Sequence, residues 1–153
     1  MKGMTIIVKT IAGWVKILIF MFGIYVVLFG DITPGGGFAG GVILASSYIL
    51  LMLAFGRESV EKNLPQALAL KLLCCGVLAF AAIALSGLFF GADGFFWNYI
   101  YQEWLAGKDV EFLKAGIIPL AELAIGLAVA MSLFLVILNL SSFRSDISAN
   151  EKE

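Results

Sequence analysis

The chain has 153 residues, of which 61% are hydrophobic and 14% are charged, whereas a typical soluble domain is about 45–50% apolar and about 25% charged. A single soluble domain of this size cannot bury such an apolar surplus, because much of its surface faces water. The formal net charge of −1 leaves no basic surface for nucleic acid, and the lack of histidine removes the usual general base and most zinc sites. We therefore expect an all-α membrane protein without a catalytic residue, metal site or cofactor.

Four apolar segments are long enough to cross a bilayer, whose core of ~30 Å needs about 20 helical residues. The expected spans are about 11–29, 38–55, 68–90 and 115–140. The first, third and fourth spans each contain one charged residue, which is Lys16, Lys71 and Glu122 respectively. We expect residues 1–140 to form one four-helix transmembrane domain, followed by a polar cytoplasmic tail at residues 141–153.

The distribution of basic residues predicts the orientation. An even number of spans places both termini on one side of the membrane. The basic residues that flank spans on that side are Lys2, Lys9, Arg57, Lys62, Arg144 and Lys152, against Lys108 and Lys114 on the other. The positive-inside rule therefore predicts a multi-pass cell-membrane protein with both termini in the cytoplasm. Lys16 and Lys71 then lie near the cytoplasmic ends of their spans, where a long side chain can reach the interface.

The three connections between spans differ in character. The first, at residues 30–37, is a tight turn, and the second, at residues 57–63, is a short charged link closed by Pro65. The third is long, at residues 91–114, and its centre is rich in Trp and Tyr, which is typical of the headgroup region. We predict a short helix lying in the outer interface between the third and fourth spans, with an ordinary aromatic belt as the alternative.

The second span begins with an unusual glycine-rich string. It consists of Pro34, Gly35, Gly36, Gly37, Phe38, Ala39, Gly40 and Gly41. The string formally contains the GxGxxG motif of dinucleotide-binding proteins, but that motif requires a preceding strand and a following amphipathic helix. A membrane span lies on each side here, which excludes nucleotide binding.

Pro34 and the glycines favour a sharp re-entry of the chain into the membrane. Because Gly37, Gly41 and Ala45 recur every four residues, the second span has a face without side chains that another helix can approach closely. Phe38 would stand out as a bulky group on this smooth patch. Helix packing of this kind does not require a role in transport. We expect the partner of the glycine face to come from outside the chain.

The string at residues 34–41 resembles the MnhB/MrpB family, the B subunits of Mrp-type multisubunit Na+/H+ antiporters. Relatives of this subunit also occur in membrane-bound hydrogenases and related ferredoxin-oxidising complexes. The resemblance extends over nearly the whole chain, through the four spans, the turn after the first span and the acid early in the last. There are two departures, because Gly30-Asp31 stands where many members have Gly-His, and Glu122 stands where many have Asp. The first departure replaces a titratable base and favours the hydrogenase-type branch weakly.

Glu122 is the strongest candidate for an ion path, since an ionisable group inside a span costs about 2.5–3.5 kcal/mol or more. Asp31 and Asp93 lie on the same side of the membrane, and carboxylates gathered there would attract cations. Lys16 and Lys71 are further candidates, although about 15 Å of depth separates them from Glu122. Any link between them would therefore need water or a partner subunit. The alternative is that Glu122 only packs against a neighbour.

A wet path between these charges would need other polar groups inside the spans. Candidates to line such a path are the hydroxyl groups of Tyr25, Ser46, Ser47, Tyr48 and Ser86. We expect most of them to form hydrogen bonds between helices rather than to line such a path.

The resemblance implies a non-catalytic membrane subunit of an Mrp-type antiporter module that helps to form or stabilise the ion path. Its partners would be the other membrane subunits, with Na+ and H+ as the transported ions. Two alternatives stay open, namely the equivalent subunit of a membrane-bound hydrogenase or ferredoxin-oxidising ion pump, and a purely structural assembly subunit. A self-sufficient transporter is disfavoured, because four spans without an internal repeat are too few for the usual transporter folds.

Overall fold

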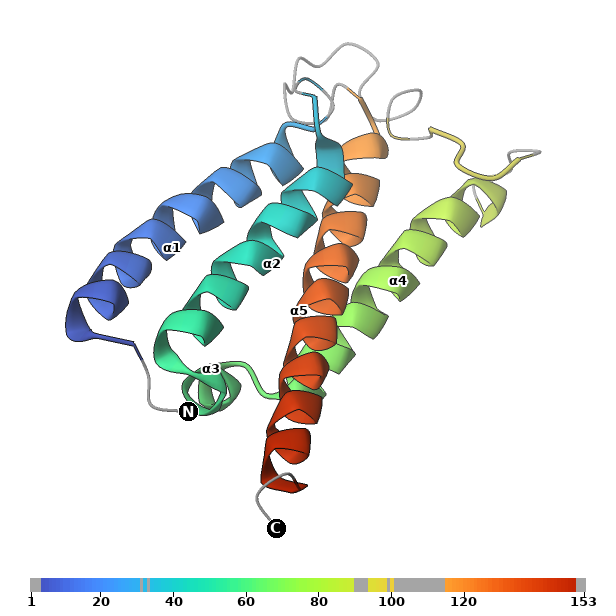
Figure 1. Ribbon diagram of the computed structural model, residues 1–153. Helices are drawn as coiled ribbons and strands as arrows, with labels where there is room; N and C mark the ends of the chain where they lie inside the picture. The colour runs from blue at the N-terminus through green and yellow to red at the C-terminus, as the bar shows by residue number, and fades with distance from the viewer. Residues whose placement is uncertain are drawn as a thin grey trace.

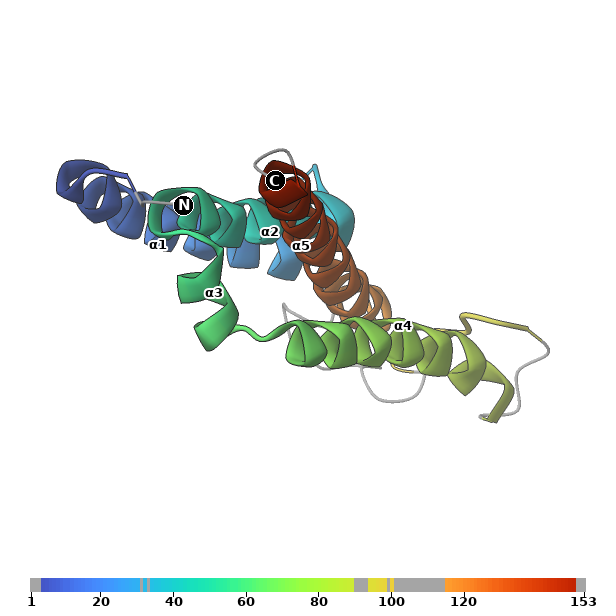
Figure 2. The same ribbon diagram turned by 60° about the horizontal axis from the view of Figure 1, so that its bottom comes forward.

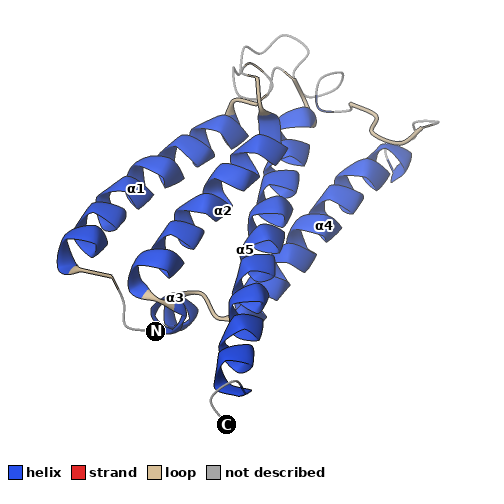
Figure 3. Cartoon of the chain, viewed as in Figure 1, coloured by secondary structure: helices blue, strands red, loops and turns tan. Residues whose placement is uncertain are grey.

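The computed structural model describes residues 4–30, 32, 34–89, 94–98, 100 and 115–150, with side chains described up to residue 143 (Figure 1). The helices are α1 (Ile6–Leu28), α2 (Gly36–Phe55), α3 (Arg57–Asn63), α4 (Gln66–Phe89) and α5 (Ile118–Asn150). Within these described ranges there is no strand, and four helices are long and apolar enough to cross a membrane (Figure 3). The predicted all-α fold with four spans is confirmed.

The four long helices form a row in the order α1, α2, α5, α4 (Figure 2). α2 packs against α1 on one side and α5 on the other, while α4 packs mainly on α5. α2 and α5 are parallel and begin at the same end of the row, which we call the glycine end; α1 and α4 run in the opposite direction (Figure 1). The described helices therefore form a layer one helix thick with two open faces.

The second connection differs from its prediction as a short charged link. Residues Arg57–Asn63 form the helix α3, in which Arg57 Nε lies 3.2 Å from Glu61 Oε2. Val60 is the apolar anchor of this helix and is 3% exposed. A seven-residue helix with one apolar anchor has no hydrophobic periodicity to reveal it. The interfacial helix predicted between the third and fourth spans falls largely on residues 99 and 101–114, which lie outside the described residues.

A compact apolar cluster holds the opposite end of the row together. Its buried members are Met52, Val60, Leu64, Ala69, Phe134, Leu135 and Leu138. They come from α2, α3, the link after α3, α4 and α5, so the cluster ties α3 to the row. A hydrogen bond from Gln66 Nε2 to Asn139 Oδ1, at 3.2 Å, joins α4 to α5 beside this cluster. The described helix α5 continues to Asn150, into the segment expected to be a polar tail.

Candidate functional site

The glycine-rich turn joins α1 to α2 at the glycine end. Gly35 has a φ of 145° and Gly36 a φ of 62°, values that residues with a side chain rarely adopt. α2 begins at Gly36, and its N-cap residue, Gly35, has no side chain with which to bind the amide groups of the first turn. The turn therefore depends on glycine for its backbone, and the start of α2 depends on other groups for its capping.

The carboxylate of Glu122, in the second turn of α5, lies against this turn. A Cβ atom added at Gly36 would be 2.9 Å from Glu122 Oε1, and one added at Gly30 would be 2.8 Å from Glu122 Cδ. Oε2 of Glu122 is buried. A negative charge beside a helix N-terminus interacts favourably with the helix dipole. Glu122 thus lies in space that only glycine leaves open, at the positive end of α2.

The glycines of α2 pack within the chain, so the expectation that their partner comes from outside is wrong for these positions. Gly37 lies against the main chain of Glu122. A Cβ atom at Gly41 would be 2.7 Å from the main-chain oxygen of Gly126 and 2.9 Å from Cβ of Val129. The pairs 37–122 and 41–126 have the same offset, as two parallel helices in close contact require. The missing side chains let the backbones of α2 and α5 meet.

Gly40 packs against α1, the other neighbour of α2. A Cβ atom there would be 2.9 Å from the main-chain nitrogen of Val27 and 3.1 Å from the main-chain oxygen of Gly23, both in α1. Phe38, by contrast, is 66% exposed, and Pro34 is exposed as well. The glycine-rich string therefore seats α2 between α1 and α5 and turns Phe38 outward.

The structure places Lys16 far from Glu122. The Lys16 ammonium group lies 5.1 Å from the centroid of the Tyr48 ring in α2, and the Tyr48 ring makes an edge contact at 6.0 Å with Phe134 in α5. Phe134 is twelve residues after Glu122 in the same helix, which corresponds to about 18 Å along its axis. A cation over an aromatic ring is stabilised by about 0.5–2 kcal/mol, so Lys16 is held within the α1–α2 contact.

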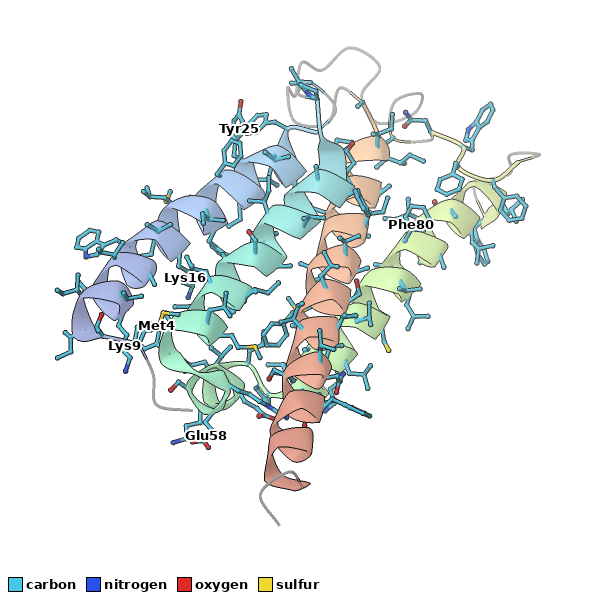
Figure 4. All side chains as sticks on the ribbon, viewed as in Figure 1. Met4, Lys9, Lys16, Tyr25, Glu58 and Phe80 are labelled. Atoms are coloured by element: carbon cyan, nitrogen blue, oxygen red, sulfur yellow. The ribbon has the colours of Figure 1, made fainter. Side chains whose placement is uncertain are left out.

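The other predicted site residues do not join this arrangement. Lys9 lies over the ring of Phe55, at 5.9 Å, and with Lys16 it forms two successive lysine–aromatic contacts between α1 and α2 (Figure 4). Lys71 is exposed on α4. Asp31 lies outside the described residues. Of the four candidate ion-path residues, only Glu122 is placed at the glycine-rich turn by the described part of the chain.

The serine hydroxyls in the spans differ from their predicted role in hydrogen bonds between helices. Ser46, Ser47 and Ser86 each donate to a main-chain carbonyl oxygen three residues earlier in the same helix, at 2.6–2.7 Å. A hydroxyl inside an apolar helix is satisfied most easily by its own backbone. These bonds use the hydroxyl hydrogens without joining one helix to another.

Asn98 is a positioning residue that no sequence pattern predicted. Its side-chain Nδ2 donates to the carbonyl oxygen of Ala115 at 3.0 Å, and the amide nitrogen of Ile117 donates to its Oδ1 at 3.2 Å. These bonds hold the start of α5, and hence Glu122 one turn later, to the connection that precedes it. The sequence offers only a weak signal, because Asn98 is one of two amide side chains, with Gln102, in the aromatic stretch at residues 95–105.

Comparison with known proteins gives consistent matches. Residues 7–135 match the family described as a domain related to the MnhB subunit of Na+/H+ antiporter. A Staphylococcus aureus (strain Newman) protein named "Putative antiporter subunit mnhB2" is 33% identical over 145 residues, which cover 95% of this chain and 100% of that protein. An uncharacterized protein of Methanocaldococcus jannaschii is 35% identical over 130 residues, which cover 84% of this chain. The aligned part is 49% of that archaeal protein, so the chain spans about half its length.

Proposed function

We propose that this chain, which belongs to the family of domains related to the MnhB subunit of Na+/H+ antiporters, is a non-catalytic membrane subunit of a multisubunit Na+/H+ antiporter. The family match confirms the resemblance first carried by residues 34–41. The S. aureus relative, which aligns over its whole length and is named as an antiporter subunit, supports the same role here. The partners would be other membrane subunits of the complex, and the ions would be Na+ and H+.

Within this role, we assign Glu122 to the ion path. The supporting observation is that its carboxylate lies at the glycine end of the row, against Gly30 and Gly36. A carboxylate retained inside an apolar helix is costly and is usually functional. Carboxylate oxygen atoms bind both protons and hard cations. Glu122 is partly exposed, and Gly30 and Gly36 beside it have no side chains that would bury it further.

The test is the substitution Glu122→Gln in the assembled complex. The amide keeps the size of the side chain and most of its hydrogen-bonding capacity but can neither carry the charge nor exchange a proton. We expect Na+-dependent proton transport in membrane vesicles to fall at least about tenfold, the effect of losing about 1.4 kcal/mol, while the subunits still assemble. Glu61→Gln, the same change in α3 outside the spans, is the matched control and should transport normally.

A purely structural role is the second candidate, and the same contact favours it. Glu122 lies at the N-terminus of α2, where a negative charge stabilises the helix by about 0.3–1 kcal/mol when exposed. If this were its whole function, Glu122→Gln would lower the stability of the complex in detergent but leave the transport rate per assembled complex unchanged. That result would remove Glu122 from the ion path and favour an assembly subunit.

Whether the subunit belongs to an antiporter or to a redox-driven complex is a separate question. Asp31, which stands where many family members have histidine, favours the equivalent subunit of a hydrogenase-type or ferredoxin-oxidising ion pump. Purification of the tagged chain from its native membrane, followed by mass spectrometry, separates the two possibilities. Antiporter subunits alone would support the first proposal, and co-purifying iron–sulfur subunits would support the redox-driven complex.

A further inference from the structure

α4 forms an edge of the row and, of the four long helices, has the least contact with its neighbours. Only 11% of its apolar span is buried within the chain, against 22%, 33% and 39% for α1, α2 and α5. Its buried residues, Ala69, Gly76 and Gly87, are small, and a Cβ atom at Gly76 would lie 3.0 Å from main-chain atoms of α5. One face of α4 thus packs closely on α5, and within the described part of the chain the remaining surface of α4 is open (Figure 2).

The open surface of α4 carries a shallow, wide-open depression that is lined by residues of α4 alone. We call it the α4 groove, and its lining residues are Leu70, Lys71, Cys74, Cys75, Leu78, Ala79 and Ala82. Lys71, Cys75 and Ala79 follow one another at intervals of four residues, the spacing along which ridges and grooves of packed helices run. Small residues at such spacing let a second helix approach closely inside a membrane. The shape and composition of the α4 groove therefore suit another helix.

Lys71 gives the α4 groove a positive charge. It is five residues after Gln66, where α4 begins, which places it about 8 Å along the helix. Lys9 and Lys16 are stabilised by aromatic rings of α2, whereas Lys71 has no ion pair and no ring contact among the described residues. A lysine at this depth favours a nearby anion, because the apolar surroundings strengthen the attraction.

We propose that the α4 groove binds a transmembrane helix of a neighbouring subunit, which places an aspartate or glutamate opposite Lys71. The charge of Lys71 and the small residues beside it are complementary to such a helix. A lipid phosphate is the other anion that Lys71 can meet, because its long side chain can extend to the interface, and labelling of Cys75 distinguishes the two. This inference rests on the proposed function, because it requires the chain to be one subunit of a larger membrane complex.

Cys74 and Cys75 are free and exposed within the α4 groove, so they provide the probe. In a Cys74→Ala background, Cys75 is labelled in native membranes with a thiol-reactive photo-cross-linker, and the complex is purified after illumination. We expect an adduct with a transmembrane peptide of one other subunit, with an aspartate or glutamate within one turn of the cross-linked residue. Adducts with phospholipid alone, with a second copy of this chain, or with a helix lacking such an acid would overturn the proposal.

Charge variants test the ion pair itself. Lys71→Glu should lower the yield of the adduct at least about tenfold, because like charges face each other. Lys71→Arg should preserve the adduct, and so should the control Lys62→Glu on α3. Replacing the identified acid by lysine in the Lys71→Glu complex should restore the adduct. An adduct that is insensitive to Lys71→Glu would overturn the pairing.

The two proposals fail in distinguishable ways. If the chain purifies without any other membrane subunit, the proposed function fails and the inference fails with it. If the chain purifies within its complex but Cys75 labels only lipid, the docking inference alone is wrong.

Discussion

The contact between α2 and α5 predicts a specific cost for one added methyl group, in the substitution Gly41→Ala. The new Cβ atom would be 2.7 Å from the main-chain oxygen of Gly126 and 2.9 Å from Cβ of Val129. Ordinary contacts of this kind begin near 3.4 Å, so α2 and α5 must separate by several tenths of an ångström. The obstacle is main chain, which cannot turn away as a flexible side chain would. Overpacking of this kind costs about 1–3 kcal/mol.

Gly13→Ala is the matched control, because a Cβ atom at Gly13 of α1 would have no neighbour within 4 Å. Both substitutions gain the same intrinsic helix propensity, up to about 1 kcal/mol, so the difference between them isolates the packing cost. The assay is unfolding of the purified chain in mixed micelles titrated with SDS, followed by tryptophan fluorescence. We expect Gly41→Ala to be about 1–3 kcal/mol less stable than Gly13→Ala. Equal stability of the two variants, within about 0.5 kcal/mol, would refute the close contact between α2 and α5.

Three further predictions concern the start of α5, the role of Lys16 and the orientation in the membrane. Asn98→Ala removes two hydrogen bonds to the start of α5 and should lower the free energy of unfolding by about 1–3 kcal/mol; unchanged stability would show that they do not hold α5. Lys16→Met should cost about 0.5–2 kcal/mol in the same assay and leave transport unchanged. A loss of transport with normal assembly would instead place Lys16 in the ion path. The predicted orientation is tested with single cysteines at two exposed positions, Phe95 and Glu58, in a Cys-free background. In intact cells an impermeant thiol reagent should label the cysteine at Phe95 and not the one at Glu58, whereas the reverse pattern would mean that both termini lie outside.

The four spans could be predicted because they depend on composition alone. A run of about 20 apolar residues with one charge or none has few other folds available to it. The helix α3 was missed, because its single buried residue, Val60, gives no periodic pattern. The order of the helices in the row was also out of reach, since apolar residues surround each span and no face is marked as the inner one.

The contact between Glu122 and the glycine-rich turn shows a second limit of the sequence. Each partner was identified by itself, Glu122 as an acid inside a span and Gly36 and Gly37 as part of an unusual string. Their contact depends on α2 and α5 being parallel neighbours, which follows from tertiary packing and not from any local pattern. The glycine face was therefore expected to bind a helix from outside the chain, and Glu122 to join an ion path or to pack against a neighbour, whereas the structure brings the two features together.

The arrangement of the helices in a single row has a consequence for how the subunit would work. A closed helix bundle has an interior that can enclose a solute. A layer one helix thick has no such interior and acts as a partition, with lipid, water or a neighbouring subunit on each side. Any route that uses Glu122 would run along the surface of this partition, with its opposite wall built by another polypeptide. Replacements in that opposite wall should then change ion selectivity as strongly as replacements in this chain.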